Sequence, residues 1–229
     1  MTRYGPFAHV TAPLLEIPNP DMTSALNLDP GSTALDEETA RAEIYGLLSA
    51  LFYQAPEPAL LAQLRVAVTE APAPGAYLEA SWREVVARAR DMSDQAIADE
   101  FTTLFGGVGK PEIYLFGSHY LSGFLNEKPL VRLRDDLTAL GLGRDEAMRE
   151  TEDHVAYLCE VMRYLIAGDD VAVANLTQQS AFFATHLQPW VSALCDTLAN
   201  HPRAVFYRSL AEFTAAFVGV EAQGFDLLS

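Results

Sequence analysis

The sequence predicts an all-α protein, a single-domain helical bundle of roughly eight to ten helices. Apolar residues recur at spacings of three and four along most of the 229-residue chain, and no segment shows the apolar and polar alternation of a strand. No repeat of fixed period occurs, which argues against a solenoid or a propeller. Half of the residues are hydrophobic, which is enough to form a sizeable core.

The first part of the chain differs in composition from the rest. Residues 1–35 contain five of the 13 prolines and no sustained apolar period. We therefore expect an extended or mobile N-terminal arm over residues 1–35 and an all-helical domain over residues 36–229. The first helix should begin near Asp36, which suits an N-cap, and should end before "YQAPEP". Its apolar face contains Ala40, Ile44, Leu47, Leu48 and Leu51.

Three helices are expected between this stop and the middle of the chain. The first spans about residues 59–68 and ends at "EAPAPG", whose prolines and glycine break a helix. The second begins at "SWRE", in which Ser81 and Glu84 have the spacing of a capping box. Ser93 should cap the third. The apolar face of this third helix contains Ile97, Phe101, Leu104 and Phe105.

The second half of the chain has the strongest helical patterns. A leucine stripe ends at Gly141, which is placed to terminate a helix in the left-handed conformation. Thr151 should cap a helix that is apolar along one face as far as Gly168. Three further helices are expected over about residues 171–185, 190–199 and 204–218. The leucine stripe comprises Leu130, Leu133, Leu137 and Leu140, and the last helix should bury Val205, Leu210, Phe213 and Phe217.

Charge and composition restrict the classes of partner. The chain carries 31 acidic and 15 basic residues, a formal net charge of −16. This charge repels nucleic acid and anionic membrane surfaces and favours a cationic partner. No run of 18 apolar residues occurs and the N-terminus lacks an apolar export segment, so we expect a cytoplasmic protein without stable membrane insertion. Cys159 and Cys195 lie in apolar helical stretches and should be small buried hydrophobes.

The common catalytic and cofactor motifs are missing from the sequence. Gly109 and Lys110 are followed by Pro111 rather than by the serine or threonine of a phosphate loop. No histidine has an acidic residue three positions before it, as helical di-iron sites require. No His-Glu-x-x-His, Cys-x-x-Cys or Gly-x-Ser-x-Gly motif occurs. The sequence therefore predicts neither a metal nor a cofactor, and a protein that is not an enzyme.

Two segments are less readily explained by core packing or by simple capping. In "YLFGSHY", residues 114–120, Pro111 and Gly117 interrupt the helical spacing of an aromatic cluster, so these residues form either core packing or the lip of a binding site. In "ETEDH", residues 150–154, acids precede an apolar helix. Helix capping explains part of this cluster, but it does not explain His154 beside Asp153 at the start of an otherwise apolar stripe.

These two segments resemble the signature of a known family, the redox-enzyme maturation chaperones of the TorD and DmsD type, which are related to nitrate reductase delta-subunit assembly proteins. The family has an aromatic and glycine-containing stretch that ends in Ser-x-Tyr. A few dozen residues later, Glu-Pro-x-Asp-His opens a helix. "LFGSHY" matches the first motif with Ser118 and Tyr120, and "ETEDH" matches the second with Glu150, Asp153 and His154. Thr151 stands where the family usually has proline, and both residues suit the beginning of a helix.

The resemblance implies a function and a set of binding residues. Such chaperones bind the twin-arginine signal peptide of the apo form of a molybdenum-containing oxidoreductase and delay its export until the cofactor is inserted. Carboxylates suit the planar guanidinium of arginine, and the apolar part of such a peptide suits a groove. The residues assigned to peptide binding on this basis are Leu104, Phe105, Leu115, Phe116, Gly117, Ser118, Tyr120, Glu150, Asp153 and His154.

Two other functions remain open at the level of sequence. One is an assembly factor that grips the catalytic subunit of its client without reading the signal peptide. The other is a small-ligand enzyme with Asp153 and His154 as an acid-base pair, although no nucleophile or metal motif accompanies them. The sequence does not specify the client, a site for guanine nucleotide or molybdopterin, the role of His154, or whether the protein is a monomer or a helix-exchanged dimer.

Overall fold

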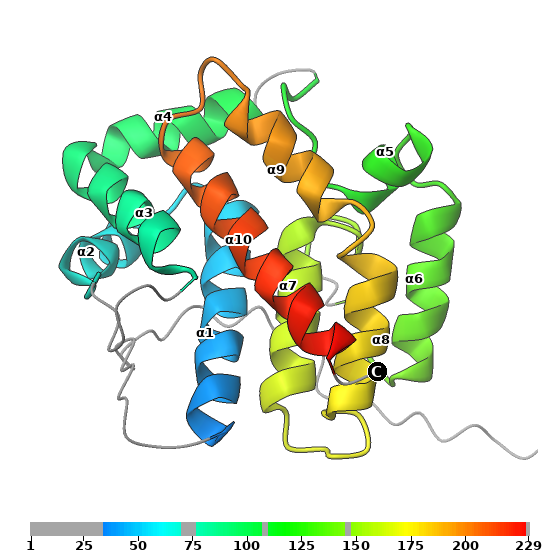
Figure 1. The fold of residues 1–229 in the computed structure, drawn as a ribbon. Coiled ribbons are helices and arrows are strands. Elements are labelled where there is room, and N and C mark those ends of the chain that lie inside the picture. Colours follow the sequence, from blue (N-terminus) through cyan, green and yellow to red (C-terminus); the bar gives the residue numbers. More distant parts are fainter. Residues whose placement is uncertain (1–33, 70–76, 107–109, 145–147, 228–229) are drawn as a thin grey trace, which may run out of the picture.

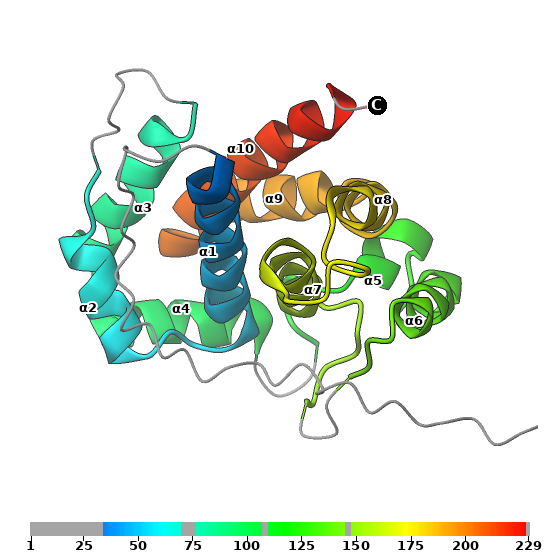
Figure 2. The ribbon, with the colours of Figure 1, turned by 90° about the horizontal axis from the view of Figure 1, so that it is seen from below.

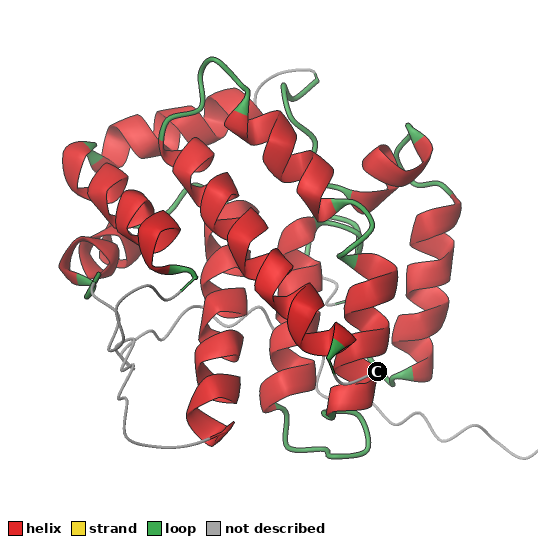
Figure 3. Ribbon diagram, in the orientation of Figure 1, coloured by secondary structure: helices red, strands yellow, loops and turns green. Residues whose placement is uncertain are grey.

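The computed structural model describes residues 34–69, 77–106, 110–144 and 148–227. These residues form ten α-helices and no β-strand (Figure 1, Figure 3), which confirms the predicted all-α class. The predicted N-terminal arm falls almost entirely on residues 1–33, which lie outside the described residues. The helices are α1 (Ala34–Tyr53), α2 (Pro58–Val66), α3 (Glu79–Asp91), α4 (Asp94–Phe105), α5 (Gly117–Ser122), α6 (Lys128–Ala139), α7 (Val155–Ala167), α8 (Leu176–His186), α9 (Val191–Ala199) and α10 (Phe206–Asp226).

The central helix of the bundle is α7. Ten of its 13 residues are buried, so it is covered on nearly all sides rather than along a single stripe. α1 packs against it most extensively, and the two helices run side by side in both ribbon views (Figure 1, Figure 2). α10 crosses this pair, with α2, α3 and α4 gathered on the α1 side and α5, α6 and α8 on the α7 side.

A buried carboxylate fixes the start of α10. Glu100 of α4 is only 8% exposed, and its two oxygens accept hydrogen bonds from the backbone N–H groups of Val205, Phe206 and Tyr207 at 2.8 to 3.1 Å. The first N–H groups of a helix have no partner within the helix, so a carboxylate from another helix satisfies them and also interacts favourably with the helix dipole. α4 and α10 are thereby joined across more than a hundred residues of sequence.

A second buried carboxylate joins the far end of α10 to α1. Glu221 accepts from Arg41 at 2.7 and 2.9 Å in a bidentate arrangement, and from the Tyr45 hydroxyl at 3.0 Å. Glu221 is 5% exposed and Tyr45 is 1% exposed. Burial of the charge is tolerated because both carboxylate oxygens have donors.

Several predicted helix features are confirmed. The Ser93 hydroxyl accepts from the Ala96 N–H at 3.2 Å and caps α4. Gly141, with φ of 71°, adopts the left-handed conformation predicted after the leucine stripe. Cys159 and Cys195 are buried free thiols. Leu210, Phe213 and Phe217 are buried on α10 as predicted.

Other predicted features are wrong. α3 begins at Glu79, so Ser81 lies inside the helix, where its hydroxyl donates to the Leu78 carbonyl instead of forming a capping box with Glu84. α8 begins only at Leu176, capped by Asn175 rather than starting near residue 171. Val205 precedes α10 and is 46% exposed rather than buried.

The role of Glu100 can be tested by substitution. Glu100→Ala should leave three backbone N–H groups without acceptors and lower the free energy of unfolding by about 3 kcal/mol or more. Glu100→Gln keeps one side-chain oxygen and should cost less than Glu100→Ala. Urea unfolding measures both values. Glu212→Ala, at an exposed position of α10, is the matched control and should change stability little. Equal stability of Glu100→Ala and the control would contradict the proposed role of Glu100.

Candidate functional site

The two segments that the sequence singled out lie side by side. Phe116 and His154 form an isolated antiparallel bridge. The Gly117 N–H donates to the Asp153 carbonyl and the Val155 N–H donates to the Leu115 carbonyl, both at 2.8 Å. The start of α5 and the start of α7 are therefore held together by paired backbone.

Asp153 holds the start of α5 with its side chain. One carboxylate oxygen accepts from the Ser118 N–H at 2.9 Å, and the other accepts from the Thr151 hydroxyl at 2.6 Å. The Asp153 side chain is 3% exposed. Thr151, predicted as the N-cap of α7, instead orients this carboxylate. Each oxygen still has acceptor capacity, because an ionised carboxylate can accept about four hydrogen bonds and these contacts use two.

His154 is the residue that caps α7. Its Nδ1 accepts from the Ala156 N–H at 3.2 Å, so a proton on the neutral ring resides on Nε2. The ring is 4% exposed and lies edge-on to Phe116 and Tyr53. Burial lowers the pKa of His154 from 6.5 to about 4, and the neighbouring Asp153 only partly opposes this shift. His154 is therefore neutral near pH 7.

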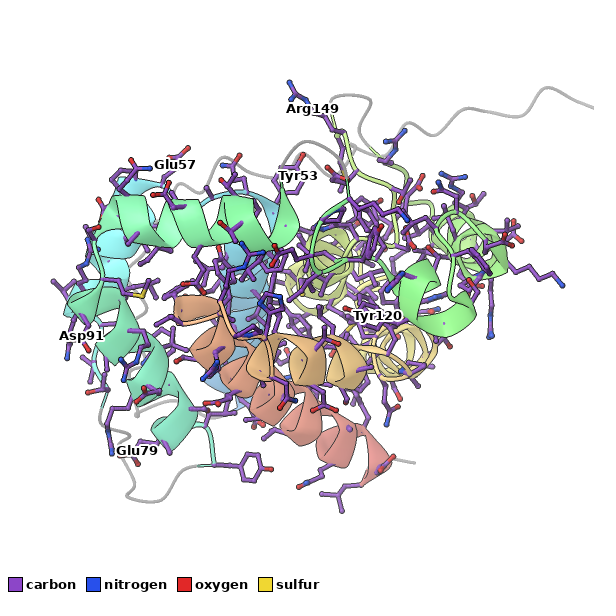
Figure 4. The ribbon with its side chains drawn as sticks, turned by 90° about the horizontal axis from the view of Figure 1, so that it is seen from above. Tyr53, Glu57, Glu79, Asp91, Tyr120 and Arg149 are labelled. Carbon is purple, nitrogen blue, oxygen red and sulfur yellow. The ribbon has the colours of Figure 1, made fainter. Side chains whose placement is uncertain are left out.

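Gly117 allows a close approach between α5 and the start of α9. A Cβ atom at Gly117 would lie 3.0 Å from the Trp190 Nε1, which is too close for an ordinary contact. The Trp190 indole donates to the His186 carbonyl at 2.6 Å, and its ring stacks on Tyr120 with a centroid separation of 5.5 Å. Figure 4 shows Tyr120 on the α5 side of the molecule, away from Glu79 and Asp91 of α3.

A cavity of about 490 Å³ opens beside this junction. Its walls come from α5, α6, the start of α7, α8 and the segment before α9. The lining residues are Gly117, Ser118, Leu121, Lys128, Pro129, Arg132, Leu133, Asp153, Leu158, Thr185, His186, Pro189 and Trp190. The volume falls within the range of about 300 to 1,000 Å³ that is usual for ligand sites.

The charges of this cavity are mixed, whereas the second motif contributed only acidic residues and His154 to the set assigned to peptide binding from the sequence. Lys128 and Arg132 contribute cations, and Asp153 is the one carboxylate among the lining residues that the structure describes. Glu152 is occupied by ion pairs with Arg134 at 2.8 Å and Arg144 at 3.7 Å. Glu150 is half-buried, and its carbonyl accepts from Arg144 at 3.1 Å.

The apolar residues assigned to peptide binding occupy different depths. Leu104 is fully buried in the core, and its carbonyl accepts from the Ile113 N–H, so it anchors the segment that precedes Phe116. Phe105 is half-buried and packs edge-on to Tyr207. Leu115 is 4% exposed, whereas Phe116 is half-buried against His154. Of the ten predicted residues, Gly117, Ser118 and Asp153 line the cavity, and the peptide-binding role of the full set stays a prediction.

Sequence reasoning missed the walls contributed by other helices. Lys128 and Arg132 of α6 and Thr185 and His186 of α8 line the cavity but belong to no motif. His186 is 7% exposed, its Nε2 lies 2.8 Å from the Asp136 carboxylate, and burial lowers its pKa. Trp190 comes directly after a proline in "HLQPW". A tryptophan beside a proline that interrupts the helical pattern was the one feature of the sequence that could have pointed to this wall of the cavity.

No described group of three or more histidine, cysteine, aspartate or glutamate side chains is placed to hold a metal ion. Within the same ranges, no helix has the length and apolarity that crossing a bilayer requires.

Comparisons with known proteins point to one family. Residues 70–196, more than half of the chain, match the family described as nitrate reductase delta subunit. A protein named chaperone protein TorD from Vibrio cholerae serotype O1 (strain M66-2) is 26% identical over 204 residues, covering 82% of this chain and 93% of its own length. A protein of the same name from Vibrio parahaemolyticus serotype O3:K6 is 24% identical over 145 residues, covering 59% of this chain and 67% of its own.

The buried His154 should make stability depend on pH. In the unfolded chain its imidazole takes up a proton as the pH falls through about 6.5, whereas in the folded chain it stays neutral down to about 4. The unfolded state therefore binds more protons between these values, and the free energy of unfolding falls on acidification by up to about 3 kcal/mol from this residue. Urea unfolding at a series of pH values measures the fall.

His154→Asn provides the comparison. Asparagine can accept from the same N–H group and cap α7, but it does not titrate. The variant should lose less stability than the wild-type chain between about pH 6.5 and 4, because the other titrating groups are common to both. Parallel stability curves for the two proteins would show that His154 is not held neutral by folding.

Proposed function

The chain belongs to the nitrate reductase delta subunit family, and on that premise we propose that it is a chaperone for the maturation of a molybdenum-containing oxidoreductase. Its curated relatives are named chaperones, and the chain is not an enzyme. We propose further that it binds the apo catalytic subunit through the twin-arginine signal peptide. Because cofactor insertion must precede export, this binding takes place in the cytoplasm.

One observation carries the proposed binding site. The two segments that resemble the family signature are far apart in sequence, yet the Ser118 N–H and the Asp153 carboxylate are 2.9 Å apart at the wall of a 490 Å³ cavity. If the hydrogen bond between Ser118 and Asp153 served only to hold α5 in place, no cavity beside it would be needed. The apolar lining from Leu121, Leu133 and Trp190 suits an apolar peptide segment.

Electrostatics supports a cationic peptide at long range, and the cavity, which also contains Lys128 and Arg132, offers such a peptide one carboxylate among its described lining residues. The net charge of −16 attracts a basic peptide and speeds association. Within the cavity, the Asp153 carboxylate keeps lone pairs beyond those used by Ser118 and Thr151, and a guanidinium can donate to them. Glu152, with Arg134 and Arg144 already bound, is a less suitable acceptor.

The assembly-factor alternative predicts a different result with a truncated client. The purified chain is immobilised, and the apo catalytic subunit of a molybdenum oxidoreductase from the same genome is passed over it with and without its twin-arginine leader. We expect removal of the leader to abolish most of the binding. Undiminished binding of the leaderless client would support an assembly factor that grips the catalytic subunit elsewhere.

Asp153 can be tested without disrupting the fold. Asp153→Asn removes the charge but keeps an oxygen for the Ser118 N–H and an amide that can donate to the Thr151 hydroxyl. Its affinity for a synthetic twin-arginine leader should fall by about tenfold, and the loss should shrink at high salt. Isothermal titration calorimetry at low and at high salt measures the affinity and its dependence on salt.

The matched control is a charge-removing variant away from the cavity. Asp91→Asn, at an exposed position of α3, should leave leader affinity nearly unchanged. If Asp153→Asn and Asp91→Asn bind equally well, Asp153 does not accept an arginine and its role is confined to holding α5.

A further inference from the structure

Exposed apolar side chains gather around the turn between α5 and α6. Phe124 is 70% exposed, Val131 57%, Leu121 42% and Leu125 41%, and these four residues are called the α5–α6 apolar turn. The other large hydrophobic residues that are exposed in the described part of the chain are dispersed over several helices and loops. The apolar turn exposes on the order of 400 Å², which is the size of patch that often has a function.

The backbone conformation of this turn holds Phe124 and Leu125 at the surface. Gly123 with φ of 79° and Asn126 with φ of 59° are both left-handed, and they flank Phe124 and Leu125. The Asn126 N–H donates to the Ser118 hydroxyl at 3.3 Å, while the Ser122 hydroxyl donates to the carbonyls of Ser118 and Phe124 at 2.7 and 3.1 Å. Left-handed backbone at a non-glycine residue is unfavourable unless the surroundings enforce it. The exposure of Phe124 and Leu125 is thus a property of an ordered turn, not of a frayed helix end.

The apolar turn is continuous with the cavity beside Asp153. Leu121 belongs to the turn and also lines the cavity. Ser118 lines the cavity, anchors Asn126 through its hydroxyl and donates its N–H to Asp153. A ligand that reaches Asp153 can therefore also contact Leu121, which is three residues before Phe124.

We propose that the α5–α6 apolar turn binds the hydrophobic segment of the leader, while an arginine of the leader reaches Asp153. This inference rests on the proposed function and adds a second contact surface to it. The hydrophobic segment binds as a helix whose apolar face covers Phe124, Leu125 and Val131. Lys128 and Arg132 lie beside Val131 on α6 and also line the cavity. Asp153 is therefore the charged group among the described lining residues that can accept an arginine, and Phe124, Leu125 and Val131 offer apolar contact alone.

A second copy of the chain fits this surface less well. A stable protein interface buries about 800 Å² on each partner, roughly twice what the apolar turn exposes. Two copies would also bring together like net charges of −16. A single apolar helix of the leader can be covered by a surface of this size, and it brings no like net charge to the chain.

The test compares two double variants at exposed positions, so that folding is preserved in both. Phe124→Ser with Val131→Ser alters the apolar turn. Tyr77→Ser with Val171→Ser removes an aromatic residue and a valine of similar exposure, 67% and 80%, outside the turn. The probe is a panel of synthetic twin-arginine leaders from the molybdenum oxidoreductases of the same genome, measured by calorimetry.

We expect the turn variant to bind the tightest leader of the panel about tenfold or more weakly, with little dependence on salt, because the lost interaction is apolar. The Tyr77 and Val171 variant should bind as the wild-type chain does. A leader carrying a photoreactive benzophenone in its hydrophobic segment should cross-link to residues 121–131. Both outcomes together support the inference.

Three results would overturn it in distinguishable ways. Equal affinity of the two double variants, with wild-type binding intact, would remove the apolar turn from the leader site and leave the proposed function standing. Absence of leader binding by the wild-type chain would refute the proposed function itself. Concentration-dependent dimerisation in analytical ultracentrifugation that is lost only in the turn variant would assign the surface to a second copy of the chain.

Discussion

The bridge between residues 115–117 and residues 153–155 is the constraint on which the candidate site depends. Two backbone hydrogen bonds of 2.8 Å set the relative position of α5 and α7, and the Asp153 carboxylate adds a third link to the Ser118 N–H. At the same point His154 caps α7 through its own ring. One short pairing therefore fixes the start of two helices, the position of the one carboxylate among the described lining residues and one wall of the cavity.

Buried acids serve repeatedly as long-range connectors in this chain. Glu100 joins α4 to α10, Glu221 joins α10 to α1, and Glu152 joins the segment before α7 to Arg134 of α6. Each is less than a tenth exposed, and each has donors that offset the loss of hydration. The acidic composition of the sequence is consequently not only a property of the surface.

The sequence predicted most helices but not how several of them begin. The leucines of α6 and the apolar residues of α7 repeat at helical spacing, so local periodicity was enough to place both helices. The cap of α7 was misplaced because the start of this helix is fixed by a pairing that is distant in sequence. α7 begins after His154 rather than Thr151, since the Val155 N–H is occupied by the Leu115 carbonyl. In the site, both motifs were identified from the sequence, whereas Lys128, His186 and Trp190 come from elements whose packing local patterns do not specify.

The bridge has a further consequence for how such a chain can vary. Because Gly117 and Asp153 are hydrogen-bonded, the segment between them, which includes α5 and α6, begins and ends at nearly the same point. α5 and α6 are in this sense an insertion closed at its base, and lengthening or replacing them alters the loop-closure entropy only slightly. Their exposed residues can vary without moving the paired starts of α5 and α7, provided that the buried Leu130, Leu133 and Leu137 of α6 are kept.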